Sequence, residues 1–583
     1  MTTLRTLVDW RRAADGGADL RALLRDRLAA IRAALTPGVW IYLASDHELE
    51  AQLAVLDPAA PLFGTPFAVK DNIDIAGVPT TAACPAFART PTRHAAVVRK
   101  LIDAGAVWLG KTNLDQFATG LVGTRSPYGR PACVDDPIRI SGGSSSGSAV
   151  AVARGDVAFA LGTDTAGSGR VPAGFNGVVG MKPTFGRVGK SGVLPACRTL
   201  DCVSLFAHDV AGAAQLLSIV EGDDPLDAYS RFVAGPGTAP LKLRVGVPVA
   251  PEFFGDAGYE SMWLQATERL HAIGAELVPV DFGPLHETAA LLYSGPWVAE
   301  RHAVVQDLLA SNPAALDPTV RQVIQGAHDF SATDTFRAQY RLREAQVRHA
   351  ALWHTVDALM VPTAPGHPRF DEIDADPIGV NARLGCYTNF VNLLGWCALA
   401  LPAGRTPGGL PFGVTFIQPG AHDAALAGIG LRWEQGRADP DRPVSAWPAS
   451  ARTLPLAVVG AHLCGLPLNH QLVERGARLR EEATTAPLYR LHALPGTNPP
   501  KPGLVRVAAN GAAIAVEVWE MPVAEVGSFL AGVAAPLGLG SLELANGECV
   551  HGFLCEAHAV VGAVDITALG GWRAYLAASA AHP

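Results

Sequence analysis

The sequence lacks the features that would tie the protein to nucleic acid or to a membrane. Its 46 Lys and Arg residues are scattered without a basic run, and the formal net charge is -8. A nucleic-acid partner usually requires clustered positive charge. No apolar run is long enough to cross a bilayer, and the chain reaches Asp9, Arg11 and Arg12 without the apolar core of a signal peptide. We therefore expect no nucleic-acid partner, no membrane and a cytoplasmic location.

Cysteine is absent from the patterns in which it usually carries chemistry. The nine cysteines are dispersed, none forms a Cys-x-x-Cys pair, and Cys197 and Cys202 are the closest two. An odd number of scattered cysteines argues against a disulfide framework or a zinc site. We therefore predict reduced, buried thiols and no metal.

Charged residues are also few, at 17%, whereas hydrophobic residues make up 49% of the chain. This balance is typical of a soluble enzyme with a large buried core. A chain of 583 residues is too long for one core, so two or more domains are expected.

Two Gly/Ser-rich loops stand out, at residues 141–148 and 162–170, on either side of an apolar segment at 149–161. A phosphate-binding loop would end in Gly-Lys-Ser or Gly-Lys-Thr, and the first loop has no lysine. A flexible linker would not lead into strongly apolar residues. A serine nucleophile remains, which needs a base and backbone donors for the oxyanion. No histidine lies near either loop, so a Ser-His-Asp triad has no local support.

A short apolar strand predicted at 66–70 ends in Lys70. Most lysines at strand ends lie on the surface. A lysine buried by its strand neighbours would have a lowered pKa and could act as a neutral base. A helix at 95–104 and a strand at 106–110 follow, which predicts an α/β sheet with covered faces. Residues 1–60 are predicted to form a helical N-terminal arm.

Three separate motifs resemble those of the amidase signature family and occur in the same order along the chain. They are Lys70, the Gly-Gly-Ser-Ser stretch at 142–145 and the segment 162–170. The resemblance continues through residues 176–184, 359–365 and 409–414, about three quarters of the chain. It implies a mixed β-sheet covered by helices and an amidase domain at 1–435.

The resemblance also implies roles for individual residues. Ser168 would be the nucleophile, Ser144 would pass its proton to a neutral Lys70, and the Gly143–Ser144 peptide would be cis. The oxyanion would be bound by the backbone N–H groups of four residues: Thr165, Ala166, Gly167 and Ser168. The alternative for Ser144 is a turn serine that bonds only its own loop.

Alanine and glycine at positions 166 and 169 depart from the commoner family pattern and resemble one subgroup, the allophanate hydrolases. The segment 293–301 also resembles that subgroup, in which the counterparts of Tyr293 and Arg301 recognise the substrate carboxylate. Arginine suits a planar carboxylate because it offers paired N–H donors. The alternative is an interfacial tyrosine and a surface arginine paired with Glu300 or another acid.

The last quarter of the chain has a different pattern. Residues 436–452 are rich in proline and charge and are predicted to be a linker. A strand at 456–463, a helix at 468–479 and strands at 487–495, 503–509, 512–519 and 541–556 predict a small α+β domain at 453–583. This part resembles the allophanate hydrolase C-terminal domain, with a gamma-glutamylcyclotransferase-like fold. His462 is the candidate for chemistry there; the alternatives are an ordinary core or surface histidine and a domain that serves only dimerisation.

The resemblance therefore predicts hydrolysis of allophanate to ammonia and carbon dioxide through an acyl-enzyme, with no metal or organic cofactor. It implies a link to a biotin-dependent urea carboxylase and a homodimer. An inactive amidase-like scaffold, another small-amide amidase and a glutamine-hydrolysing amidotransferase subunit remain as alternatives.

Overall fold

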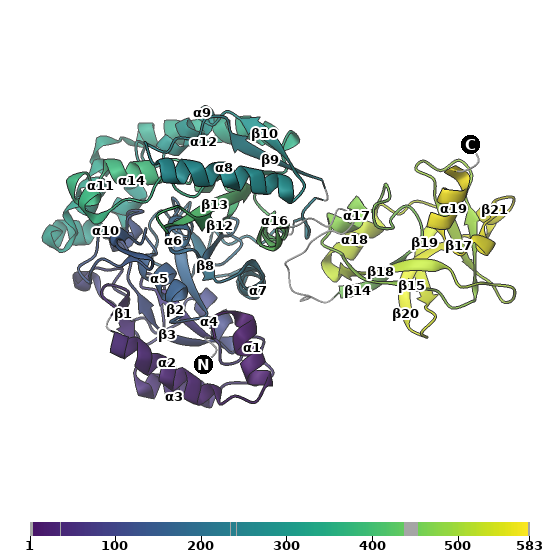
Figure 1. Cartoon of the computed structure of the whole chain (residues 1–583), viewed down its shortest axis with the longest axis horizontal. Coiled ribbons are helices and arrows are strands. Elements are labelled where there is room, and N and C mark those ends of the chain that lie inside the picture. Colours follow the sequence, from purple (N-terminus) through teal and green to yellow (C-terminus); the bar gives the residue numbers. More distant parts are fainter. Residues whose placement is uncertain (1–3, 35, 234, 241, 437–452, 581–583) are drawn as a thin grey trace. The chain divides into compact units, whose positions relative to one another are not determined.

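The computed structural model describes residues 4–34, 36–233, 235–240, 242–436 and 453–580. Its contacts divide the chain into two compact units (Figure 1). The first contains Met1–Ala234 and Lys242–Ala438, and the second contains Gly235–Leu241 and Asp439–Pro583. The domain predicted at 1–435 included the short segment 235–241, which the contacts group with the second unit. The predicted linker lies, apart from Gly436, outside the described residues.

The first unit is built on an 11-stranded sheet in the order β1-β3-β2-β6-β8-β7-β12-β13-β11-β9-β10. Its strands are β1 (Trp40–Leu43), β2 (Pro66–Lys70), β3 (Val107–Thr112), β6 (Phe159–Asp164), β7 (Val179–Lys182), β8 (Cys202–Ala207), β9 (Leu243–Pro248), β10 (Ala275–Val280), β11 (Ala358–Pro362), β12 (Cys397–Arg405) and β13 (Pro411–Gln418). A small ribbon pairs β4 (Ala132–Cys133) with β5 (Asp136–Ile140). The sheet is mixed, because β2 is parallel to β3 and β6 whereas β8 is antiparallel to β6.

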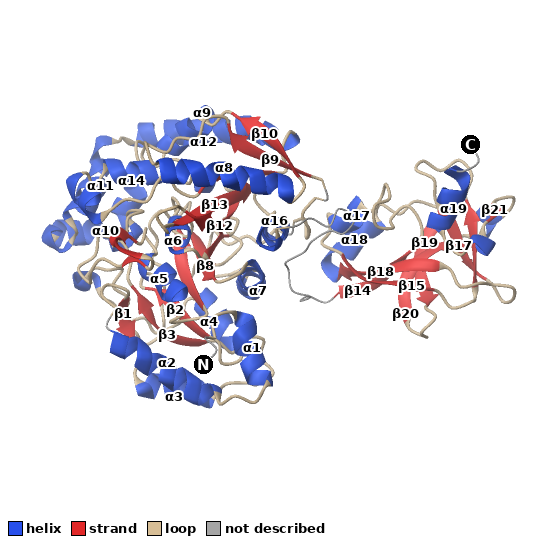
Figure 2. Ribbon diagram, in the orientation of Figure 1, coloured by secondary structure: helices blue, strands red, loops and turns tan. Residues whose placement is uncertain are grey.

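Helices surround this sheet, as Figure 2 shows. They are α1 (Leu7–Asp15), α2 (Leu20–Ala34), α3 (Asp46–Ala54), α4 (Ala96–Asp103), α5 (Ser146–Arg154), α6 (Val171–Asn176), α7 (Val210–Val220), α8 (Ala257–Ala272), α9 (Gly283–Ala290), α10 (Val298–Ser311), α11 (Pro318–Gln325), α12 (Ala332–Ala350), α13 (Phe370–Ala375), α14 (Gly379–Leu384), α15 (Asn389–Leu393) and α16 (Asp423–Gln435). The predicted α/β fold with a mixed sheet covered by helices is confirmed.

The central strands explain where the site forms. Every residue of β2, β3 and β6 is buried, as expected for strands covered on both faces. Because these three strands are parallel, their carboxyl ends meet at one edge of the sheet. At this edge, Lys70 is the last residue of β2, and Thr163 and Asp164 are the last two residues of β6.

The predicted helical arm at 1–60 is correct for α1, α2 and α3 but misses β1. This four-residue strand pairs antiparallel with β3 and forms the edge of the sheet. A segment this short carries too little periodicity to be distinguished from a loop.

The second unit has an α+β architecture. A five-stranded sheet has the order β15-β18-β14-β20-β19, and a three-stranded sheet has the order β17-β16-β21. The strands are β14 (Thr453–Val458), β15 (Arg478–Thr484), β16 (Tyr489–Ala493), β17 (Pro502–Arg506), β18 (Ala515–Pro522), β19 (Leu537–Glu543), β20 (Cys549–Cys555) and β21 (Val564–Asp565), and the helices are α17 (His470–Val473), α18 (Val526–Leu530) and α19 (Trp572–Ala580).

Two elements of this unit were predicted wrongly. The single strand expected at 541–556 is instead the end of β19 and the whole of β20, which pair antiparallel. The helix expected at 468–479 is only the four-residue α17, and the chain then enters β15. β15 lies at the edge of its sheet and carries three exposed charged residues, Arg480, Glu481 and Glu482. Arg480 forms ion pairs with Glu481 and Glu548. Charged side chains on an edge strand resemble the solvated face of a helix, so local pattern misassigns them.

Among the residues described by the structure, none of the helices combines the length and the apolar character needed to span a bilayer.

Candidate active site

Lys70 is fully buried, so the alternative of a surface lysine is wrong. Its Nζ donates 2.8 Å hydrogen bonds to Ser144 Oγ and Thr163 Oγ1. Burial lowers the pKa of Lys70 to about 7, although the carboxyl groups of Asp115, Asp201 and Asp164 oppose the shift. An amine with this pKa is substantially neutral near pH 7 and can accept a proton.

Ser144 lies within the first Gly/Ser loop and is fully buried. The Gly143–Ser144 peptide bond is cis, as predicted from the resemblance. The carbonyl of Ser144 accepts a 3.1 Å hydrogen bond from the backbone N–H of Asp115, and Gly143 donates to the carbonyl of Leu121 at 2.8 Å. The loop is therefore held from outside itself, which a simple turn serine would not require.

Ser168 is 2% exposed and follows Gly167, whose φ of 136° lies in the region that favours glycine. A Cβ at position 167 would lie 2.4 Å from Thr388 Oγ1, so glycine is also required by space. Within the described chain, the Ser168 hydroxyl makes no hydrogen bond, so the structure joins Lys70 to Ser144 but not Ser144 to Ser168. Catalytic contacts are often longer in a free enzyme than with substrate bound.

An ion pair inside the second loop shapes the turn that carries Ser168. The Asp164 carboxylate accepts two 2.9 Å hydrogen bonds from the Arg170 guanidinium, and neither side chain is exposed. It also accepts hydrogen bonds from the backbone N–H groups of Gly167 and Gly169. Burial alone would raise the pKa of Asp164, but Arg170 and these donors hold it below its usual value.

This ion pair changes the predicted oxyanion site. The N–H of Gly167 is already donated to Asp164 at 3.0 Å, so it is not available to a substrate oxygen. For the N–H groups of Thr165, Ala166 and Ser168, no partner exists among the residues that the structure describes. The predicted set of four donors is thereby reduced to three.

A second buried carboxyl group holds the first of these donors. Asp201 accepts a 2.5 Å hydrogen bond from the Thr165 hydroxyl and further bonds from the N–H groups of Ala196 and Cys197. Burial raises the pKa of Asp201, which these hydrogen bonds oppose. Asp201 therefore fixes the Thr165 side of the loop.

Arg301 is 2% exposed and is not paired with Glu300, so the alternative of a surface arginine is wrong. One terminal nitrogen donates to the Ala118 carbonyl at 3.3 Å and to Thr119 Oγ1 at 3.2 Å. The other reaches Tyr293 Oη at 3.5 Å, and the guanidinium lies 5.5 Å from the Tyr293 ring centre. Tyr293 precedes α10, which begins at Val298. The positive charge of Arg301 lowers the pKa of Lys70.

Three residues that sequence reasoning missed belong to this site: Thr163, Asp115 and Asp201. Thr163 lies on β6, next to Asp164, and its hydroxyl also accepts from Asn72 at 3.3 Å. The Asp115 carboxyl group accepts hydrogen bonds from the backbone N–H groups of Gly123 and Arg125. In the sequence, each of these residues is recognisable only as a polar side chain within a segment that becomes buried. That pattern does not show which residue it will contact.

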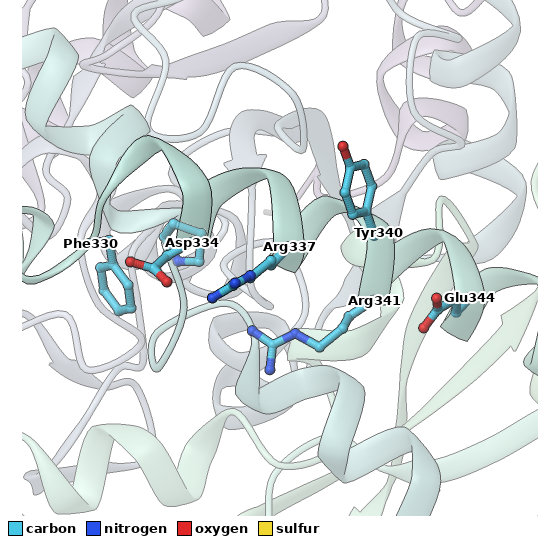
Figure 3. Close-up of a pocket in the computed structure, with 7 residues that line it drawn as sticks. Phe330, Asp334, Arg337, Tyr340, Arg341 and Glu344 are labelled. Atoms are coloured by element: carbon cyan, nitrogen blue, oxygen red, sulfur yellow. The ribbon is translucent and has the colours of Figure 1, made fainter.

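A surface pocket of about 520 Å³ lies along α12 (Figure 3). Arg337 and Arg341 extend into the same region from the helix, with Asp334 and Phe330 nearby (Figure 3). None of the predicted site residues lines it.

The second unit places His462 at a separate cavity of about 150 Å³, which Gln471, Asn498 and Lys501 also line. His462 Nε2 lies 3.0 Å from Gln471 Oε1, and its ring stacks on Phe553 with centroids 4.9 Å apart. Burial lowers the pKa of His462. Because an amide oxygen can only accept, Nε2 carries the proton and Nδ1 is the basic nitrogen.

Comparison with known proteins gives matches over both units. A family model described as Amidase matches residues 30–427, and one described as Allophanate hydrolase C-terminal domain matches residues 454–577. The urea amidolyase of Saccharomyces cerevisiae is 42% identical over 98% of this chain, but the match covers 33% of that protein. The chain thus spans about a third of the length of this relative.

Two further relatives differ in how much of this chain they match. A solved structure of Kluyveromyces lactis allophanate hydrolase is 41% identical, covers 98% of both chains and superposes with a TM-score of 0.86. A glutamyl-tRNA(Gln) amidotransferase subunit of Synechococcus sp. is 32% identical, and its match covers 96% of that protein but 74% of this chain. The similarity to the amidotransferase leaves about a quarter of the present chain unmatched.

Proposed function

This chain belongs to the amidase family and carries an allophanate hydrolase C-terminal domain, and from that premise we propose that it hydrolyses allophanate (urea-1-carboxylate) to ammonia and carbon dioxide. The observation that carries the proposal is the hydrogen bond from the buried Lys70 to Ser144. It provides a neutral base one hydroxyl away from the loop that presents Ser168.

In the proposed reaction, Lys70 accepts a proton from Ser144 while Ser144 accepts the proton of Ser168. The Ser168 Oγ then attacks the terminal amide carbonyl, and a C–O bond forms as the carbonyl electrons move to oxygen. The N–H groups of Thr165, Ala166 and Ser168 would bind this oxyanion, which is supported by their lack of a protein partner within the described chain. The proton returns through Ser144 to the leaving nitrogen, the C–N bond breaks and ammonia departs.

Water then releases the acyl group from Ser168 by the same relay, and the product is N-carboxycarbamate. We assign recognition of the substrate carboxylate to Arg301 and Tyr293. This assignment is supported by the burial of Arg301 and by the position of its guanidinium beside the Tyr293 hydroxyl. A buried cation of this kind disfavours amides that have no anionic group.

For the second unit, we propose that His462 assists decarboxylation of N-carboxycarbamate. The C–N bond to one carboxylate would break, carbon dioxide would leave and the nitrogen would gain a proton, giving carbamate, which decomposes to ammonia and carbon dioxide. The cavity beside His462, with Lys501 in its wall, supports a small anionic ligand. A role restricted to dimerisation is the alternative.

The urea amidolyase relatives also support a functional link to a biotin-dependent urea carboxylase, which would supply allophanate. The homodimer, the cytoplasmic location and the absence of a metal or organic cofactor remain predictions.

The proposal is tested by measuring ammonia release from allophanate, malonamate, acetamide and glutamine with the full chain. Allophanate should have the highest kcat/KM. The similarity to the glutamyl-tRNA(Gln) amidotransferase makes glutamine hydrolysis the second candidate, and preference for glutamine would support it. No release from any amide, together with no covalent labelling of Ser168 by a fluorophosphonate, would indicate an inactive scaffold.

A further inference from the structure

The residue that precedes Arg301 in α10 makes a contact that the proposed reaction does not use. The Glu300 carboxylate accepts a 3.0 Å hydrogen bond from the backbone N–H of Thr199 and a second, short one from the Thr199 hydroxyl. The two residues are 101 positions apart in the sequence. Both lie on the wall of a groove of about 910 Å³ in the first unit.

Thr199 belongs to a turn, residues 196–201, that is closed on itself. The N–H groups of Leu200 and Asp201 both donate to the Cys197 carbonyl at 2.9 Å. At its far end, the Asp201 carboxyl group holds Thr165, which offers one of the three free oxyanion donors. Movement of this turn away from Thr165 would break the buried hydrogen bond between the Thr165 hydroxyl and Asp201.

Helix α10 is attached to the same turn at a second point. The Cys197 thiol donates to the carbonyl of Trp297 at 3.6 Å, and Trp297 is the N-cap residue of α10. The Trp297 side chain makes no capping hydrogen bond. Helices usually fix their first turn with a capping side chain. Here Cys197 and Thr199 fix it instead, through contacts at positions 297 and 300.

These contacts form a continuous connection between Arg301 and Thr165. It runs from Arg301 to Glu300 within one helical turn, from Glu300 to Thr199, and through the turn 196–201 to Asp201 and Thr165. Arg301 is the proposed carboxylate ligand, and Thr165 lies at the proposed oxyanion site.

We propose that Glu300 is a positioning residue that acts through Thr199: it holds the Arg301 guanidinium at the separation from the oxyanion donors that suits an amide with a carboxylate as near as that of allophanate. This inference rests on the proposed function. Glu300 does not touch the reacting atoms, so its loss should weaken substrate binding more than chemistry. Hydrogen bonds to a charged group are stronger than neutral ones, so a measurable loss is expected.

The test compares Glu300→Gln, Thr199→Val and Thr199→Ser in the full chain. For the first two, KM for allophanate should rise about tenfold while kcat changes less than about twofold. Thr199→Ser keeps the hydroxyl and should stay within about twofold of the wild type. Asp307→Asn, an exposed carboxylate on the same helix, is the matched control.

Two further readouts separate positioning from a general structural role. The rate of Ser168 labelling by a small fluorophosphonate needs no carboxylate contact, so Glu300→Gln should change it less than about twofold. In an Arg301→Gln background, Glu300→Gln should cause no further rise in KM, because the group that it positions is gone.

An unchanged KM, an equal loss in labelling rate or additive losses in the Arg301→Gln background would overturn the inference. Absence of wild-type turnover of allophanate would remove the proposed function itself, and the wild-type assay detects this separately.

Discussion

Lys70 and Ser144 are joined by a 2.8 Å hydrogen bond in a position where neither side chain is exposed to solvent. A lysine in this position has lost the hydration that normally stabilises its charge. The carboxyl groups of Asp115, Asp201 and Asp164 restore part of this stabilisation, and the resulting pKa is about 7. The pair can therefore exchange a proton near neutral pH, which an ordinary lysine cannot do.

The first prediction concerns the pH dependence of catalysis. Lys70 must be neutral to accept a proton, and its charged form predominates below its pKa of about 7. The value of kcat/KM should therefore fall about tenfold per pH unit below that pKa and level off above it. Initial rates of ammonia release between about pH 5.5 and 9 would measure this, and a flat profile through this range would contradict a lysine base.

Charged residues near Lys70 should shift the pH at which kcat/KM begins to fall, the acidic limb of the pH profile. An acidic and a basic neighbour should shift it in opposite directions. Asp115 raises the pKa of Lys70 and Arg301 lowers it. Asp115→Asn should therefore shift the limb to lower pH, and Arg301→Gln should shift it to higher pH. Melting temperatures would control for loss of folding. Shifts in the same direction would show that the limb belongs to another group.

A third prediction tests the carboxylate contacts. Arg301→Lys keeps the charge but loses the paired donors, so kcat/KM for allophanate should fall roughly 10–100-fold. Tyr293→Phe removes one hydroxyl and should cost about tenfold. If both variants kept wild-type KM for allophanate, recognition would have to lie elsewhere in the pocket.

The parts of the site that could be predicted from the sequence lie within continuous motifs. Lys70 closes an apolar strand, and the two Gly/Ser loops carry Ser144 and Ser168, so residue type and family resemblance together indicate them. The partners of these residues could not be predicted. Asp201 meets Thr165, and Glu300 meets Thr199, across 36 and 101 positions of sequence, and only the packed fold brings them together.

The secondary structure could likewise be predicted only in part. The fully buried strands β2 and β3 were predicted from composition, because burial on both faces favours apolar residues along most of each strand. β15 is not, because an edge strand with charged side chains has the local pattern of a helix. The reduction of the oxyanion donors from four to three was also unpredictable, since it depends on where the Asp164 carboxylate points.

The buried Asp164–Arg170 pair gives a prediction for stability. Arg170→Met would leave the Asp164 carboxylate without its cation in a fully buried position. Removing one partner of a buried pair typically costs about 3–5 kcal/mol. Thermal or urea unfolding should show the first unit destabilised by this amount, and the double variant Asp164→Asn/Arg170→Met should lose less than the sum of the single variants. Additive losses would mean that the two side chains do not act together.

The role of the second unit can be separated by product analysis. In the full chain, His462→Ala should leave the first release of ammonia from allophanate intact and slow the release of carbon dioxide. With ¹³C-labelled allophanate, N-carboxycarbamate should accumulate in the NMR spectrum. Equal carbon dioxide release by wild type and His462→Ala would assign this unit a structural role.

The decisive measurement is the initial rate of ammonia release from allophanate by the purified wild-type chain and by Ser168→Ala. The nucleophile assignment predicts rapid release by the wild type and none by the variant, which should still fold because only one hydroxyl is lost. Substantial turnover by Ser168→Ala would contradict Ser168 as the nucleophile, and with it the proposed acyl-enzyme route.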